Sequence, residues 1–256
     1  MIAPSVISGY LQRIGHTGPR QPTAETLRHL HRAHMLAVPF ENLDISLGRK
    51  IICEEDSFLR KIVEQRRGGF CYELNGAFAA LLRELGFKVT LLSARVPSED
   101  GRSSPEFDHL ALRVDLQEPW LADVGFGDLF NEPLLLRSEG GHEQDGRRFR
   151  IVEQAGRFQL DRTEPDGSWK RQYSFTLVPR RLDEFASMCH HHQTSPESPF
   201  TRKKVCSMAT PDGRITISDR RLIITRNHEK KERLLDSEDE WKSALAEYFG
   251  VILGQG

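Results

Sequence analysis

The chain has 256 residues, which is enough for one large domain or two to three small ones. Its 36 lysines and arginines nearly balance 37 aspartates and glutamates, and the formal net charge of -1 excludes the global basic field of a typical nucleic-acid-binding protein. No apolar run approaches the roughly 20 residues that span a bilayer, and the first residues lack the pattern of a signal peptide. We therefore expect a cytoplasmic protein with no nucleic-acid or membrane partner.

The first third of the chain has the apolar spacing of helices. Residues 23–38 form the first candidate helix, which Pro39 would end, and residues 57–65 form the second. Residues 71–85 form the third, with an apolar stripe that Gly86 closes. This pattern predicts an N-terminal helical bundle over residues 1–86.

After Gly86 the apolar pattern changes to short segments separated by Gly, Pro, Asp and Ser, which is typical of a mostly antiparallel sheet or barrel. The candidate strands cover residues 87–96, 109–116, 120–126, 148–154 and 157–163, and then residues 203–210, 214–219 and 221–226. A last helix begins at Ser237, where Glu240 three residues later completes a capping box. The chain is thus predicted as one compact α+β protein, with a central β region over residues 87–192 and a mixed α/β region over residues 193–256.

The stretch RGGFCYELN, residues 67–75, places Cys71 at the start of a predicted helix. The positive end of the helix dipole favours a thiolate there, while Gly68 and Gly69 would let the backbone turn and leave room for a substrate near the sulfur. The alternative is a packed core cysteine, because Cys71 lies on the apolar face of its helix. The four cysteines of the chain form no CxxC pair, so we expect neither a disulfide framework nor a zinc knuckle.

A nucleophilic thiol needs an imidazole within hydrogen-bond reach and a carboxylate that orients this imidazole. His109 begins a predicted strand, and the turn at residues 117–119 returns the chain as the next strand, so this hairpin brings Asp123 to within a couple of positions of His109. Asp108 would point to the opposite face. Asp123 has apolar neighbours, a poor place for an idle carboxylate, although each of the three residues also has an ordinary structural explanation. Together they predict a triad of Cys71, His109 and Asp123.

The run CHHH at residues 189–192 contains residue types that bind metal ions. Consecutive residues rarely bind one ion together, so we predict no metal site there. A polar loop leading into the C-terminal region is the simpler interpretation.

The sequence resembles the arylamine N-acetyltransferase family over nearly its whole length. The motifs that carry the resemblance are PFENLDI (39–45), RGGFCYELN (67–75), HLALRV (109–114), DVGFG (123–127), TSPESPF (194–200) and VCSMATPDG (205–213). The resemblance implies a helical bundle, a β-barrel and an α/β lid around a cysteine-protease-like core, with Cys71, His109 and Asp123 as the catalytic triad. It also implies transfer of an acetyl group from acetyl-CoA to aromatic amines, hydrazines and hydroxylamines by a ping-pong route through an acetyl-cysteine.

The resemblance assigns further residues to sites. The matched positions are Glu41 and Arg67 for an interior ion pair, Phe40 and Phe126 for the acceptor pocket, and Gly125, Thr210 and Phe200 for the CoA cleft. The loop PEFD at residues 105–108 departs from the small residues that the family often has before its histidine, so CoA contacts from this loop are in doubt. Within the basic run 202–204, Lys203 and Lys204 would bind CoA phosphates, with a solvated patch as the alternative.

Two other functions compete with this hypothesis. One is an amide synthase of the same family, which closes a macrolactam from a carrier-protein thioester, and the other is a Cys-His-Asp hydrolase that gives its acyl group to water. Phe126 and the basic C-terminal region favour CoA. The expected partners are CoA and a small arylamine or hydrazine acceptor, and the protein is expected to be a monomer or a homodimer.

Overall fold

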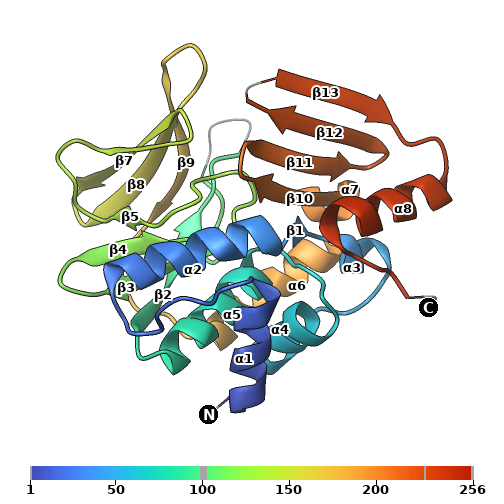
Figure 1. Cartoon of the computed structure of the whole chain (residues 1–256). Helices are drawn as coiled ribbons and strands as arrows, with labels where there is room; N and C mark the ends of the chain where they lie inside the picture. Colours follow the sequence, from blue (N-terminus) through green and yellow to red (C-terminus); the bar gives the residue numbers. More distant parts are fainter. Residues whose placement is uncertain (1, 99–102, 228, 255–256) are drawn as a thin grey trace.

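Two antiparallel sheets flank a central group of helices in the computed structural model, which describes residues 2–98, 103–227 and 229–254 (Figure 1). The helices are α1 (Pro4–Arg13), α2 (Ala24–Ala37), α3 (Leu43–Ser46), α4 (Glu55–Leu59), α5 (Cys71–Glu84), α6 (Ala186–Thr194), α7 (Pro199–Arg202) and α8 (Glu238–Phe249), with a π-helical turn η1 (Arg60–Glu64) and a 3-10 turn η2 (Leu182–Phe185). This arrangement confirms the predicted α+β class.

The larger sheet is nearly closed and barrel-like, with the strand order β5-β4-β3-β2-β9-β8-β7-β6. Its strands are β2 (Lys88–Arg95), β3 (His109–Asp115), β4 (Pro119–Ala122), β5 (Leu134–Leu135), β6 (His142–Gln144), β7 (Arg147–Gln154), β8 (Arg157–Thr163) and β9 (Trp169–Phe175). The two edge strands meet where the ring of His142 hydrogen-bonds to the carbonyl of Leu135 at 3.1 Å. The closed shape protects strand edges that would otherwise be free to pair with other chains.

The smaller sheet has the order β1-β10-β11-β12-β13 and combines two distant parts of the chain. Its strands are β1 (Phe40–Glu41), β10 (Val205–Thr210), β11 (Gly213–Ser218), β12 (Arg221–Arg226) and β13 (Glu229–Leu234). Phe40 pairs with Ser207 on one side and bridges to Gly69 on the other. β1 therefore connects the C-terminal sheet to the segment that leads into Cys71.

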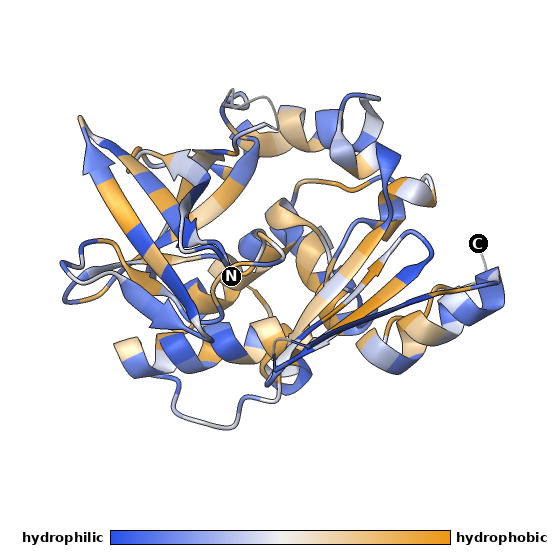
Figure 2. Ribbon diagram, turned by 90° about the horizontal axis from the view of Figure 1, so that it is seen from above, coloured by the Kyte–Doolittle hydropathy of each residue, from blue (hydrophilic) through white to orange (hydrophobic). Residues whose placement is uncertain are grey.

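Helix α5 lies at the centre of the molecule, and every residue from Cys71 to Leu82 is buried. Apolar residues concentrate on the central helices and alternate with polar ones along the strands (Figure 2). Gly76 allows α4 to pack closely, because a Cβ at this position would lie 2.7 Å from the ring of Phe58. At the other end of the chain, Ser237 caps α8 by accepting a hydrogen bond from the N–H of Glu240 at 3.1 Å.

Two local predictions were wrong, over residues 120–126 and 189–192, and the helix predicted over residues 57–65 is present with shifted bounds. The strand expected over residues 120–126 ends at Ala122, because residues 123–127 turn away from the sheet. The helix expected over residues 57–65 begins at Glu55 and widens into the π-helical turn η1 after Leu59. Residues 189–192 are helical, within α6, rather than a loop. The division of the chain at residues 86 and 192 remains a prediction. Among the described residues, no helix combines the length and hydropathy needed to span a membrane.

Candidate active site

Cys71 begins helix α5, and its position depends on the glycine pair before it. A Cβ at Gly68 would lie 1.8 Å from the carbonyl oxygen of Pro39, and a Cβ at Gly69 would lie 2.6 Å from the carboxylate of Glu73. The two glycines therefore allow the chain to pack closely against Pro39 and Glu73, and the room that we expect beside the sulfur remains a prediction. Glu73 completes the start of the helix by accepting a hydrogen bond from the N–H of Phe70 at 3.1 Å.

His109 and Asp123 are brought together by the hairpin of β3 and β4. Leu112 pairs with Ala122, which leaves Asp123 two positions along from His109. The imidazole Nε2 lies 2.7 Å from the Asp123 carboxylate, and both side chains are almost fully buried. Because this carboxylate only accepts, Nε2 carries the proton and Nδ1 is the nitrogen left for another partner.

Besides His109, two further groups hold the Asp123 carboxylate. Its Oδ1 accepts hydrogen bonds from the Asn75 amide at 2.8 Å and from the N–H of Gly125 at 3.0 Å. The N–H of Asp123 in turn donates to Nε2 of His31 at 3.2 Å. Burial alone would raise the pKa of Asp123, but the charge and hydrogen bond of His109, with those of Asn75 and Gly125, hold this pKa below its usual value. Asp123 is therefore ionised and fixed in place.

Cys71 lies against both halves of this arrangement. The backbone N–H groups of Leu110, the residue after His109, and of Tyr72 lie near the thiol and act to lower its pKa. A Cβ at Gly125 would lie 2.8 Å from Cα of Cys71, so only glycine lets the loop after Asp123 approach helix α5 this closely. Burial raises the pKa of the thiol well above its usual value, in spite of the two N–H groups. The helix dipole that we expected to favour the thiolate is outweighed, so deprotonation needs a base.

Aromatic rings surround the imidazole. The ring of Phe126 meets that of His109 edge to face at 5.2 Å, and the ring of Tyr173, from β9, lies 5.1 Å from it. Phe40 lies beside Gly127, where a Cβ would be 3.5 Å from the Phe40 ring, and its own ring is 6.2 Å from that of Phe200. These rings provide the flat apolar surfaces that an aryl group packs against.

Sequence reasoning missed several residues that hold the site. Tyr173 stands in a strand that the apolar pattern did not single out, and Asn75 and His31 lie on helices among apolar neighbours. For Asn75 a signal was present, because an amide in the middle of an apolar helix face needs a partner. The other two depend on contacts between elements far apart in the sequence.

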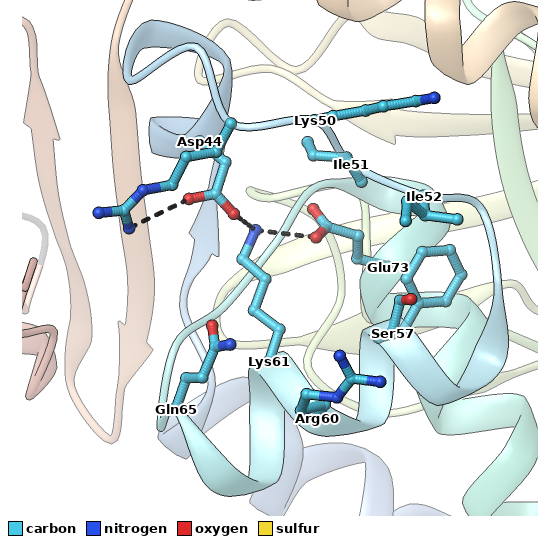
Figure 3. A pocket seen from close by; sticks show the side chains of 11 residues that line it. Asp44, Lys50, Ile51, Ile52, Ser57, Arg60, Lys61, Gln65 and Glu73 are labelled. Atoms are coloured by element: carbon cyan, nitrogen blue, oxygen red, sulfur yellow. Dashed lines mark hydrogen bonds and ion pairs between the residues drawn. The ribbon is translucent and has the colours of Figure 1, made fainter. Parts of the chain in front are cut away.

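Behind the start of α5 lies a buried group of five charges, which we call the Glu73 cluster: Glu41, Asp44, Lys61, Arg67 and Glu73. Arg67 donates to Glu41 at 2.8 Å and to Asp44 at 3.0 Å. Lys61 lies between Asp44 at 2.7 Å and Glu73 at 2.8 Å, in the wall of a cavity of about 380 Å³ (Figure 3). The ion pair expected for Glu41 and Arg67 is thus part of a larger network.

A second charged group, the Asp128 cluster, links the two sheets and consists of Asp128, Arg147, Arg162 and Arg214. The carboxylate of Asp128 lies 2.6 Å from Arg147 of β7, 3.6 Å from Arg162 of β8 and 3.2 Å from Arg214 of β11. These four residues line a cavity of about 730 Å³.

The positions expected to bind CoA are dispersed. Thr210 lines the cavity of about 730 Å³, and Gly125 lies against Cys71. Phe200 packs beside Phe40, as described above. Lys203 and Lys204 are exposed on the C-terminal part, with the ammonium of Lys204 5.3 Å from the ring of Trp241, and neither lysine lines that cavity. Over the described ranges, no group of three or more His, Cys, Asp or Glu side chains is arranged to bind a metal ion.

The chain matches known proteins over most of its length. A model of the N-acetyltransferase family matches residues 23–256. The chain is 34% identical over 274 aligned positions to the arylamine N-acetyltransferase pineal gland isozyme NAT-3 of Gallus gallus, covering 96% of this chain and 94% of that protein. The structure of the Salmonella typhimurium arylamine N-acetyltransferase superposes with a TM-score of 0.93 at 29% identity, covering 99% and 94% of the two chains. That of the Mycobacterium marinum arylamine N-acetyltransferase in complex with CoA gives 0.88 at 30% identity, covering 96% and 92%.

The family match places the protein among the N-acetyltransferases, enzymes that transfer an acetyl group to nitrogen. More narrowly, the chain belongs to the arylamine N-acetyltransferase family, because the similarity extends over almost the whole length of both proteins.

Proposed function

We propose that this protein transfers the acetyl group of acetyl-CoA to arylamines and arylhydrazines, and to the oxygen of N-hydroxyarylamines, through an acetyl thioester on Cys71. The observation that carries the proposal is the buried thiol of Cys71, which lies against the strand that begins at His109, whose imidazole is bound to Asp123. The solved structure of a relative with CoA supports the choice of donor.

In the first half of the reaction, His109 takes the proton of the Cys71 thiol on Nδ1, because Nε2 is held by Asp123. The thiolate attacks the thioester carbonyl, and the CoA thiolate leaves with the proton that the imidazolium returns. One thioester replaces another, so the step costs little free energy. The N–H groups of Leu110 and Tyr72 stabilise the thiolate while it exists.

In the second half, the acceptor nitrogen attacks the acetyl-cysteine, and His109 removes a proton from this nitrogen as the new amide forms. The Cys71 thiolate leaves and is reprotonated by the imidazolium, which restores the starting state. Asp123 keeps the imidazole in the correct tautomer and stabilises its cation in both halves. The rings of Phe40 and Phe126 would hold the aryl group of the acceptor.

The test is incubation with acetyl-CoA followed by intact-protein mass spectrometry and then addition of an arylamine. We expect one acetyl group on Cys71 and its discharge by the amine. Cys71→Ala should lose both events while remaining folded. Cys206→Ala, which removes a buried cysteine of the smaller sheet, should keep both.

Turnover by a folded Cys71→Ala protein would remove the central step of the proposal. Release of free acetate at the full rate without an amine would instead indicate a hydrolase. Acylation from a carrier-protein thioester but not from acetyl-CoA would indicate an amide synthase.

A further inference from the structure

A second histidine–carboxylate pair, formed by the buried His192 and the partly exposed Asp108, lies directly beside the first. His192 of α6 is 5% exposed, and its Nε2 lies 3.2 Å from the carboxylate of Asp108. Asp108 and His109 are adjacent in the chain and point to opposite sides, so that each belongs to a different one of the two pairs. The pair of His192 joins residues 84 positions apart and fixes α6 to the start of the strand that carries His109.

The hydrogen bonds of His192 continue to the ring of Phe200. Its Nδ1 lies 3.1 Å from the hydroxyl of Ser198, and this hydroxyl accepts a hydrogen bond from the N–H of Phe200 at 3.2 Å. The carbonyl of Phe200 is held by the side-chain amide of Asn42 at 3.0 Å. With Nε2–H donated to Asp108, Nδ1 accepts from Ser198, so both nitrogens of a neutral imidazole are used.

The same side chains touch the catalytic helix. The ring of Phe200 lies 5.1 Å from the ring of His192 and 5.7 Å from that of Phe70, the residue before Cys71. The hydroxyl of Tyr72, the residue after Cys71, donates to the carbonyl of Asp108 at 3.2 Å. Phe200 is only half-buried, and its side chain has no polar group that could fix its direction through a hydrogen bond. The position of the ring therefore depends on the contacts that hold helix α7, to which Phe200 belongs.

We propose that His192, through its bonds to Asp108 and Ser198, is a positioning residue that sets the ring of Phe200 as a wall for the aryl group of the acceptor. The inference rests on the proposed function. The inference concerns the acceptor rather than the acyl donor, because the Phe200 ring lies beside the rings of Phe40 and Phe70. Aromatic side chains pack favourably against another aromatic ring, such as the aryl group of the acceptor. A leucine at position 192 would leave the Asp108 carboxylate and the Ser198 hydroxyl without their partner.

The experiment compares His192→Leu and His192→Gln with wild type and with the control His190→Leu, which changes an exposed histidine of the same helix. Acetylation of Cys71 by acetyl-CoA is followed by intact mass, and steady-state kinetics are measured for an arylamine and for hydrazine, which has no ring. For His192→Leu we expect the arylamine KM to rise about fivefold or more with little change in kcat, because a ring displaced by about 1 Å no longer aligns its partner. The KM for hydrazine and the rate of Cys71 acetylation should stay near wild type.

His192→Gln can still donate to Asp108, so its arylamine KM should lie between wild type and His192→Leu, and His190→Leu should match wild type. Phe200→Leu should raise the arylamine KM by itself and add little to His192→Leu, because both changes remove the same wall. An unchanged arylamine KM in His192→Leu, or equal losses with the arylamine, with hydrazine and in Cys71 acetylation, would overturn the inference. Failure of the wild-type protein to become acetylated would instead count against the proposed function.

Discussion

The two charged clusters of this protein carry opposite excess charge, and the fold treats them differently. The Glu73 cluster has three carboxylates for two cations and is almost completely buried, whereas the Asp128 cluster has three guanidinium groups around one carboxylate and is partly exposed, with the side chains of Arg147 and Asp128 39% and 47% exposed. A carboxyl group can relieve excess negative charge by keeping its proton, and the pKa of Glu73 is raised to about 7 by burial and by its acidic neighbours. A guanidinium has no such escape, because it keeps its proton at any ordinary pH. The Arg147 side chain is 39% exposed, whereas Arg162, which also pairs with Glu164 at 3.2 Å, and Arg214 are 17% and 13% exposed.

The first way to break the Glu73 cluster is to remove a cation. Arg67→Met keeps an apolar side chain of similar length but removes the guanidinium nearest to Glu41 and Asp44, which then keep only Lys61 and, for Asp44, the exposed Arg49 at 4.0 Å. We expect a loss of about 3–5 kcal/mol in the free energy of unfolding. Chemical denaturation measures this loss. Arg60→Met, which changes an exposed arginine of η1, is the control and should stay within about 0.5 kcal/mol of wild type. Similar values for the two variants would show that the cluster does not stabilise the fold.

The second prediction concerns the proton on Glu73. The folded pKa of about 7 lies above the ordinary value of 4.5, so between these two pH values the folded state holds a proton that the unfolded state has lost. The stability from this proton is complete below pH 4.5 and disappears as the pH rises through 7. Wild type should therefore lose up to about 3 kcal/mol between pH 4.5 and 8 relative to Glu73→Gln, which cannot titrate. Parallel pH profiles of unfolding free energy for the two proteins would contradict the raised pKa.

A third prediction follows from the same imbalance. Lys61→Met leaves three carboxylates around one cation, and adding Glu73→Gln removes one of the excess negative charges. The double variant should be more stable than the sum of the two single losses predicts, by about 1–2 kcal/mol. Denaturation of the four proteins of this cycle measures the coupling. Additive losses would mean that Lys61 and Glu73 act independently.

The local parts of the site were predictable from sequence, because they depend on short-range patterns. Helix α5 was expected over residues 71–85 and spans Cys71–Glu84, and the hairpin that brings His109 to Asp123 follows from two strands and one short turn. The turn after Ala122 was missed because Asp123 accepts a hydrogen bond from Gly125, and this bond replaces the next pair of the sheet. Apolar neighbours alone gave that segment the appearance of a strand.

Helix α6 was missed for a different reason. Its buried positions are Cys189 and His192, three residues apart, which is a helical spacing. One of these two residues is a histidine, which a hydropathy pattern counts as polar, so the pattern did not reveal the helix. His192 is buried only because Asp108, 84 positions away, supplies its partner. The Asp128 cluster depends in the same way on strands far apart in the chain, and no local pattern encodes such a meeting.

The smallest expected effect is the loss of stability on removing the charge of Asp128, and its response to salt tests the difference between the two clusters. Asp128→Asn leaves Arg147, Arg162 and Arg214 facing one another, but because these groups are partly exposed, solvent screening should limit the loss to about 1 kcal/mol. The repulsion that remains should be screened by roughly 1 M salt, where the Debye length is only about 3 Å, so the difference from wild type should shrink in denaturation at high salt. Arg67→Met should keep its deficit under the same conditions, because the carboxylate of Glu41, which loses its guanidinium partner, is fully buried and out of reach of salt ions. If both deficits respond equally to salt, the two clusters do not differ in solvent access, and the contrast between them fails.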